Sequence, residues 1–225
     1  MLNDSLKLSY LSTSSTYLFV QSLVTFLILA DLTSKAKAVS TSLLIILLSL
    51  FIETIGVQTG FPFGSYEYTK VLSPIFPGGV PLAIAFAWMT LSVNSFIILK
   101  YFLKNKNKYF VILLSGLLIA FIDVLLEPFA SFINNYWIWA GSTIPFQNYL
   151  SWFVIGTAFS FILDIIIGKY ILSVKISFPI IVLASSIFQF LLINILNNYY
   201  FNSVIGISGI LIIFLTLFYL LKNEK

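Results

Sequence analysis

The chain has 225 residues, of which 60% are hydrophobic and 9% are charged. Soluble domains usually carry about 25% charged residues, so this composition excludes an ordinary soluble fold and indicates a single integral membrane domain over residues 1–225. The sequence contains no cysteine and no histidine. It therefore excludes thiol catalysis, Cys-ligated metals and His-ligated haem. The formal net charge is +4, and every basic residue is a lysine.

We predict an all-α polytopic membrane fold, because the apolar stretches are long enough for about seven transmembrane helices. Two of the twelve lysines, Lys7 and Lys70, fall on one face of this arrangement and the other ten fall on the opposite face. The positive-inside rule then places the N-terminus outside and the C-terminus in the cytoplasm, in a multi-pass protein of the cell membrane. This lysine asymmetry also explains the positive net charge, so we expect membrane lipid as a partner and no nucleic acid. The predicted spans lie near residues 14–31, 39–57, 80–102, 109–130, 149–171, 176–196 and 203–221.

Two connections, 58–79 and 131–148, are longer than the others, and both are predicted on the outer face. Both are rich in aromatic residues, glycine and proline, and both are poor in charge. Their tryptophans, with Trp152 just beyond, are typical of an interfacial belt. Connections this apolar can also fold back as a lid or re-entrant element where protein buries the backbone.

Five of the eight acidic residues lie inside or beside predicted spans, and three of them form a candidate site: Glu53 in the second span, and Asp123 and Glu127 in the fourth. A carboxylate at membrane depth costs at least ~2.5 kcal/mol, so such residues usually have a function or a structural partner. Asp123 and Glu127 are four residues apart and therefore share a helix face. Pro128 follows at once and is expected to kink or end that helix. Both spans run outward, which places all three carboxyls at one depth beneath the two long connections.

No lysine is predicted at this depth, so burial and mutual repulsion favour the protonated form of at least one carboxyl. A neutral acid beside an ionised carboxylate separates the roles of acid and base. Such a pair can protonate an unactivated double bond and stabilise the resulting carbocation, and aromatic faces attract the cation as well. The candidate aromatic lining consists of Tyr66, Tyr68, Trp88, Trp137 and Trp139.

Structural and metal-binding roles stay open for these carboxyls. Buried Asp and Glu can hydrogen-bond neighbouring helices, and three carboxylates can bind Mg²⁺ or Ca²⁺. The Asp-rich repeat of a diphosphate-binding prenyltransferase is absent, and we favour a site without a metal. Two other acidic residues are predicted to form ordinary ion pairs: Asp31 lies four residues before Lys35, and Asp164 lies close to Lys169.

The segment from Glu53 to Tyr68 is the most distinctive in the chain. Its pattern is Glu53, Gly56, Thr59-Gly60-Phe61-Pro62-Phe63-Gly64, Tyr66 and Tyr68. It continues with Pro81, Trp88, Asp123-x-x-x-Glu127-Pro128, Trp137-Ile138-Trp139, Pro145, Asn148 and Trp152. In these residues, from about position 45 to 170, the chain resembles the membrane carotenoid hydratase family. That family includes the archaeal bisanhydrobacterioruberin hydratases and the bacterial 1′,2′-hydratases.

The resemblance implies an enzyme that adds water to the terminal isoprenoid double bond of a long acyclic polyene within the bilayer. One carboxyl would protonate the less substituted carbon, and a second would orient water and take its proton. We favour Asp123 or Glu127 as the acid and Glu53 as its partner, with the reverse left open. Such chemistry requires no cofactor. The residues expected to bind the substrate are Thr59, Phe61, Phe63, Tyr66, Tyr68, Trp88, Trp137, Trp139, Asn148 and Trp152.

Two other functions stay open. A membrane lycopene cyclase begins with the same protonation but traps the cation with an internal double bond. Polar residues in the outer connections would favour water access and hence the hydratase; they are Gln58, Thr59, Gln147 and Asn148. A proton-coupled small carrier would also use carboxyls in the membrane. A retinal-binding photoreceptor is excluded, because the last predicted span contains no lysine for a Schiff base.

Overall fold

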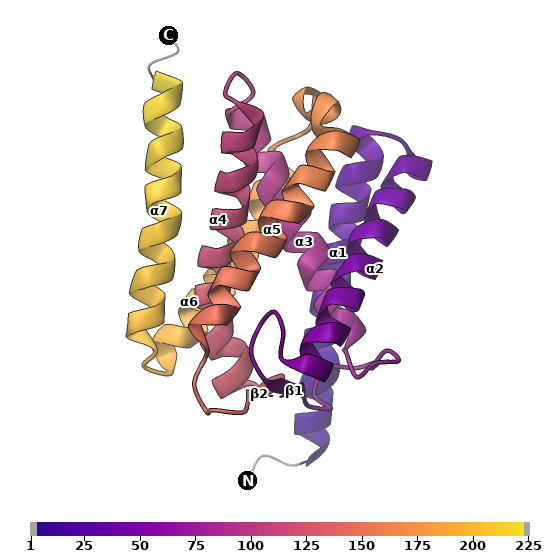
Figure 1. Ribbon diagram of the computed structural model, residues 1–225, viewed down its shortest axis with the longest axis vertical. Helices are drawn as coiled ribbons and strands as arrows, with labels where there is room; N and C mark the ends of the chain where they lie inside the picture. The colour runs from indigo at the N-terminus through magenta and orange to yellow at the C-terminus, as the bar shows by residue number, and fades with distance from the viewer. Residues whose placement is uncertain (1–3, 223–225) are drawn as a thin grey trace.

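The computed structural model describes residues 4–222, with side chains described from residue 13 onward except at 172–173, 216–217 and 220–221. Seven α-helices stand side by side, with the N-terminal end of the chain at one end of the bundle and the C-terminal end at the other (Figure 1). The helices are α1 (Asp4–Leu32), α2 (Lys35–Thr59), α3 (Leu82–Phe102), α4 (Lys108–Glu127), α5 (Phe146–Ile167), α6 (Ser177–Leu196) and α7 (Tyr200–Lys222).

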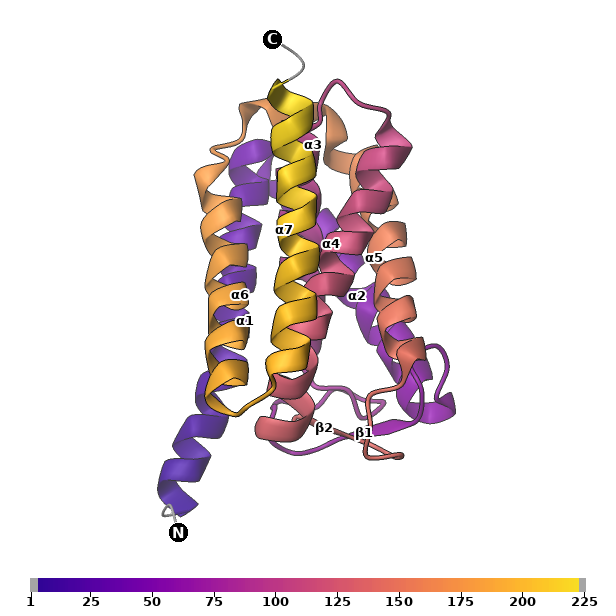
Figure 2. The same cartoon turned by 90° about the vertical axis from the view of Figure 1, so that its left-hand side faces the viewer.

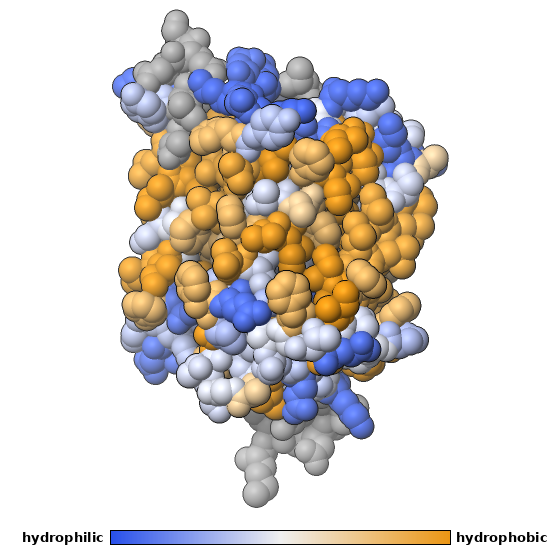
Figure 3. Space-filling model, in the orientation of Figure 1, coloured by the Kyte–Doolittle hydropathy of each residue, from blue (hydrophilic) through white to orange (hydrophobic). Residues whose placement is uncertain are grey.

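Six of these helices, α1 to α6, are long and apolar enough to cross a membrane. In α7 the apolar stretch with fully described side chains is Tyr200–Leu215, which is shorter than a span, so the predicted seventh span stays a prediction. The surface agrees with a membrane protein, because a broad apolar belt separates two polar ends (Figure 3). Helix α3 is the most buried of the six and forms the centre of the bundle.

The sequence analysis predicted an all-α fold, but the structure also contains two short strands. These strands, β1 (Tyr66–Tyr68) and β2 (Trp137–Trp139), pair in an antiparallel sheet at the N-terminal end of the bundle (Figure 2). Tyr66 lies opposite Trp139, and Tyr68 lies opposite Trp137. The two long connections therefore satisfy each other's backbone groups, which an apolar loop near a membrane must do. We call these paired connections, residues 60–81 and 134–145, the lid.

The ends of the helices beneath the lid follow from glycine and proline. Gly60 has a positive φ of 74° and ends α2, with its N–H bonded to the carbonyl of Gly56 at 2.8 Å. Pro128 lacks an N–H, and from this residue α4 continues as a short π-helix, Pro128–Ile133. The predicted disruption of the fourth helix at Pro128 is therefore confirmed as a change of helix type.

Both predicted ion pairs need correction. Asp164 is paired with Lys100 of α3, at 2.7 Å between Nζ and Oδ1, and not with Lys169. The partner comes from another helix, which spacing along one helix could not show. Among the described residues, Asp31 and Lys35 form no ion pair, because α1 ends at Leu32 and the chain turns before α2 begins, so helical i,i+4 geometry is lost.

Candidate active site

Glu53 lies near the lid end of α2 and is 4% exposed. Its carboxyl accepts three hydrogen bonds: from the hydroxyls of Tyr66 (2.6 Å) and Tyr68 (2.8 Å) to Oε2, and from the indole N–H of Trp88 (2.8 Å) to Oε1. The two tyrosines come from β1 and the tryptophan from α3. The lid therefore contacts this carboxyl directly.

Gly56 makes that contact possible. It lies one turn beyond Glu53 on α2, and a Cβ added there would stand 2.7 Å from a ring carbon of Phe63 and 2.9 Å from the hydroxyl of Tyr66. Both distances are shorter than real side-chain contacts allow. Only glycine leaves room for the lid to reach the carboxyl.

Glu127 and Asp123 form a second, linked pair of carboxyls, 1% and 0% exposed. The side-chain amide of Asn148 joins them, donating to Oε1 of Glu127 at 2.8 Å and to Oδ2 of Asp123 at 2.9 Å. The other oxygen of Glu127 accepts from the indoles of Trp139 (3.0 Å) and Trp137 (3.3 Å). Within the described part of the chain, Oδ1 of Asp123 has no hydrogen-bond partner.

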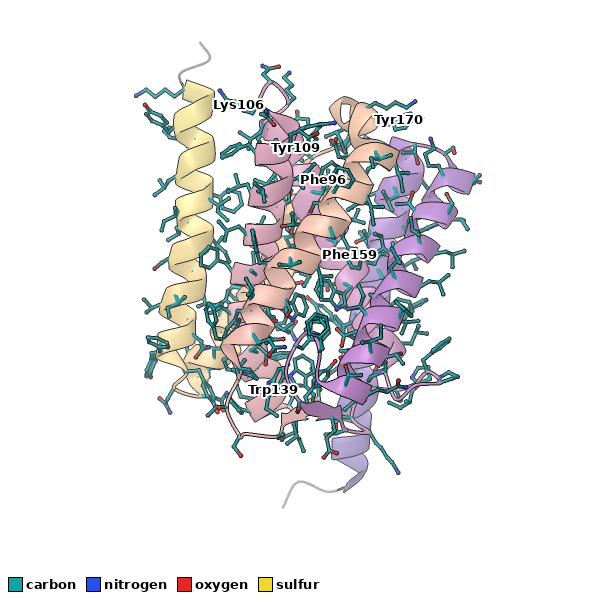
Figure 4. The ribbon with its side chains drawn as sticks, viewed as in Figure 1. Phe96, Lys106, Tyr109, Trp139, Phe159 and Tyr170 are labelled. Atoms are coloured by element: carbon teal, nitrogen blue, oxygen red, sulfur yellow. The ribbon has the colours of Figure 1, made fainter. Side chains whose placement is uncertain are left out.

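One cavity of about 850 Å³, its opening included, lies between these two carboxyl sites. Glu53 and Glu127 line it, and none of the described lining residues is a lysine. Figure 4 shows Trp139 near the lid end of the bundle, at the same end as these carboxyls. The aromatic lining residues are Tyr17, Phe63, Tyr66, Tyr68, Phe129, Tyr136, Trp137, Trp139, Trp152 and Phe190.

Most of the predicted site residues come together here. Phe63, Tyr66, Tyr68, Trp137, Trp139, Asn148 and Trp152 line the cavity with the two glutamates. Trp88 and Asp123 stand immediately behind that wall. Trp88 bonds to Glu53 and stacks on Trp152 with 3.9 Å between ring centroids, while Asp123 is held by Asn148.

Thr59 and Phe61 do not join the site. The Thr59 hydroxyl donates to the carbonyl of Ile55 at 2.7 Å and accepts from the Phe61 N–H at 3.1 Å, so it serves the turn that ends α2. Phe61 is 70% exposed. The reason is local, since the left-handed Gly60 turns the chain outward before it returns at Phe63.

The outer polar residues that were predicted to give water access mostly have another role. The Gln147 amide donates to the carbonyl of Pro62 at 2.7 Å, and the same carbonyl accepts from Ser151 at 2.6 Å. These bonds fasten the lid to α5. Gln147 and Thr59 thus form hydrogen bonds to backbone carbonyls. Asn148, another of these outer polar residues, lines the cavity.

Sequence reasoning missed the part of the site that α1 and α6 contribute. Tyr17, Gln21, Ser186 and Gln189 line the cavity. The available signal was the position of Gln21 and Gln189 inside apolar spans, where an amide usually needs a partner. Only packing shows that these two helices meet at the cavity.

The tyrosines of β1 keep their protons. Burial raises the pKa of Tyr66 and Tyr68 well above the usual value, and the nearby Glu53 carboxylate, when ionised, raises the pKa further. Both phenols therefore remain neutral and can donate or accept a hydrogen bond. No group of three or more Asp or Glu residues within the described chain lies in an arrangement that could hold a metal ion.

Fold and site together define a helical membrane protein with buried carboxyls in an aromatic cavity. The chain belongs to the carotenoid biosynthesis protein family, whose model matches residues 13–215. The bisanhydrobacterioruberin hydratase of Haloarcula japonica is 29% identical over 123 residues, which cover 52% of this chain and 42% of that protein. The match thus spans less than half of the relative's length. No solved structure matches. The family resemblance predicted from the sequence is confirmed.

Proposed function

We propose that this protein is a carotenoid hydratase of the cell membrane, which adds water to the terminal isoprenoid double bond of a long acyclic polyene. One observation carries the proposal: Glu53 and Glu127, from different helices, border one aromatic cavity whose described lining residues include no lysine. An alkene has no polar group that an enzyme can bind or activate, so its protonation needs a strong acid in an apolar site. The similarity to a hydratase supports the same reaction class.

The hydrogen-bond donors around each carboxyl suggest which one carries the proton. Glu127 is surrounded by two indole N–H groups and an amide N–H, which can donate but cannot accept. Such a shell suits an ionised carboxylate. Glu53 has one donor-only partner, the Trp88 indole, and two tyrosine hydroxyls, and a hydroxyl can also accept a hydrogen bond from a protonated carboxyl.

We therefore assign Glu53 as the general acid and Glu127 as the base, the reverse of the assignment favoured from the sequence. Asp123, which has one donor and one unpartnered oxygen, stays neutral behind the wall and keeps a second negative charge away from Glu127. Three ionised carboxyls this deep in a membrane would be very costly without a counter-ion.

In the reaction, Glu53 gives its proton to the less substituted alkene carbon, and the neighbouring carbon becomes a tertiary cation. A water molecule adds to this carbon while Glu127 accepts one of the water protons. A proton then returns from Glu127 to Glu53, so that the net change is one C=C and one water consumed and one tertiary alcohol formed. The faces of Trp137, Trp139 and Trp152 attract the cation before water arrives.

The proposed topology has seven spans, with the lid and N-terminus outside and the C-terminus in the cytoplasm. Lys106 and Tyr170 lie at the end of the bundle opposite the lid (Figure 4). That end carries most of the lysines of the connections, in agreement with the positive-inside rule. Tyr66 and Tyr68 then connect Glu53 to the outer lid and provide a route for protons.

The test is mass spectrometry of carotenoids from hosts that produce lycopene or a C50 polyene, with and without this gene, in ¹⁸O-labelled water. We expect a product heavier by one water and carrying the label. Wild type should form the labelled product, and Glu53→Gln and Glu127→Gln should form none. If both variants are still present in the membrane, this result supports the two roles. Asp123→Asn should keep part of the activity, since Asp123 does not line the cavity.

The alternatives give different products. A cyclised isomer of unchanged mass would identify a cyclase and refute the hydration step. An unchanged carotenoid profile with both polyenes would refute the proposed enzyme and favour the carrier. Full activity in Glu53→Gln would overturn its assignment as the acid.

A further inference from the structure

One wall of the cavity carries three polar side chains from three helices. They are Gln21 of α1, Thr90 of α3 and Ser186 of α6, and all three line the cavity. Their exposed fractions are 7%, 1% and 2%, so they do not face solvent. Polar side chains in a bilayer protein usually serve helix contact or a ligand.

The three residues lie at one level of the bundle. The Asn94 amide of α3 donates to the Thr25 hydroxyl of α1 at 2.8 Å, which sets these two helices in register. Since α1 and α3 run in the same direction, Thr90 and Gln21, each four residues earlier, share the next level toward the lid. The Gln21 amide reaches Ser186 at 2.9 Å.

This level is separate from the carboxyl pair of α4. The Asn194 amide of α6 donates to the carbonyl of Leu125, two residues before Glu127. Ser186 is eight residues before Asn194 on the same helix, which corresponds to roughly 12 Å along its axis. Ser186 therefore lies about two turns deeper in the membrane than the carboxyl pair of α4.

The group has unused hydrogen-bonding capacity. Within the described part of the chain, the Thr90 hydroxyl has no hydrogen-bond partner, although it is buried and lines the cavity. The side-chain amide of Gln21 has two N–H groups and three hydroxyl oxygens within hydrogen-bond distance. These oxygens belong to Tyr17 (2.7 Å), Ser185 (3.1 Å) and Ser186 (2.9 Å). A buried donor left unpaired in a wall that faces a cavity indicates a ligand atom opposite it.

We propose that Gln21, Thr90 and Ser186 form a second subsite of the cavity, which binds a neutral hydroxyl oxygen. Hydroxyl and amide groups supply donors and acceptors but no charge, so the subsite suits neither an anion nor a metal ion. The oxygen belongs either to an alcohol group on the polyene or to a water molecule held for the cation. This proposal rests on the polyene site of the proposed function.

The first test is a binding experiment that needs no turnover. Quenching of tryptophan fluorescence, which the wall tryptophans make sensitive to a bound polyene, gives the affinities of purified protein for lycopene and for 1-hydroxylycopene. The test variant is Thr90→Val, which removes the hydroxyl at nearly constant volume. The matched control is Thr41→Val, because Thr41 is also 1% exposed with an unpartnered hydroxyl but does not line the cavity.

If the oxygen is a polyene alcohol, wild type binds the hydroxylated polyene about 3- to 10-fold more tightly, as expected for one or two neutral hydrogen bonds. Thr90→Val abolishes this preference and Thr41→Val retains it. The preference should persist in Glu53→Gln, which separates the subsite from the hydration chemistry. Ser186→Ala should lower the preference as well.

If the oxygen is water, both polyenes bind equally, and the product ratio changes instead. In Thr90→Val, more of the carbocation then loses a proton from another carbon instead of adding water. It leaves the site as an unlabelled double-bond isomer. Identical affinities and product ratios in Thr90→Val and Thr41→Val would overturn the subsite while leaving the proposed function standing. Failure of wild type to bind either polyene would overturn both.

Discussion

Asn148 offers the sharpest test of how charge is divided among the carboxyls. Its amide is the sole described link between Glu127 and Asp123, with bonds of 2.8 and 2.9 Å. Asn148→Leu removes both donors and keeps a similar volume. We expect the variant to be destabilised, because two buried carboxyl oxygens lose a hydrogen-bond partner.

The magnitude follows from the charge of each acceptor. A hydrogen bond to an ionised group contributes about 1.5–3 kcal/mol and a neutral one about 0.5–1.5 kcal/mol. With Glu127 ionised and Asp123 neutral, Asn148→Leu should cost about 2–4.5 kcal/mol of unfolding free energy. In a Glu127→Gln background the lost bond is neutral, so the cost should fall by about 1–2 kcal/mol. In an Asp123→Asn background it should change by less than ~0.5 kcal/mol.

The assay is equilibrium unfolding in mixed micelles, followed by tryptophan fluorescence, for the single and double variants of both cycles. Asn194→Leu is the matched control, since Asn194 is another fully buried amide that donates to α4, but to the neutral carbonyl of Leu125 at 2.7 Å. Its cost should not depend on Glu127→Gln. A coupling energy with Asp123 as large as that with Glu127 would refute the division of charge and the assignment of Glu127 as the base.

Three further predictions concern the lid and the topology. Tyr66→Phe and Tyr68→Phe should each lower the hydration rate several-fold, and the double variant by about 10²-fold or more, since Glu53 then loses the groups that can pass it a proton; labelled product formation measures this, and a fully active double variant would contradict the relay. Gly64→Ala should cost about 1–3 kcal/mol in a thermal unfolding assay, because Gly64 has a φ of +112° and the added Cβ would stand 2.7 Å from Pro145; an unchanged melting temperature would contradict the close approach. A reporter enzyme fused to the C-terminus should be active in the cytoplasm, and an external signal would refute the seven-span topology.

Much of the helical frame could be predicted from the sequence. Six predicted spans overlap α1 to α6, because apolar runs of membrane length have few other ways to satisfy their backbone. Their ends agree within a few residues except at the start of α1, which begins at Asp4 and not near residue 14. The three buried carboxyls were also predicted, since an acidic residue in such a run is conspicuous. The partner of Asp164 was not predicted, because Lys100 lies 64 positions away in the chain.

The sequence by itself determined the class of protein, the carboxyls and the aromatic segments that accompany them. Tertiary structure decided which donors surround each carboxyl, and hence which one is suited to hold the proton. Glu53 receives Tyr66 only because β1 pairs with β2, and Glu127 receives Trp139 through the same sheet. Gln21 joins the cavity only because α1 packs against α6. Local pattern records burial and helix length, whereas contacts between distant segments depend on how the helices pack.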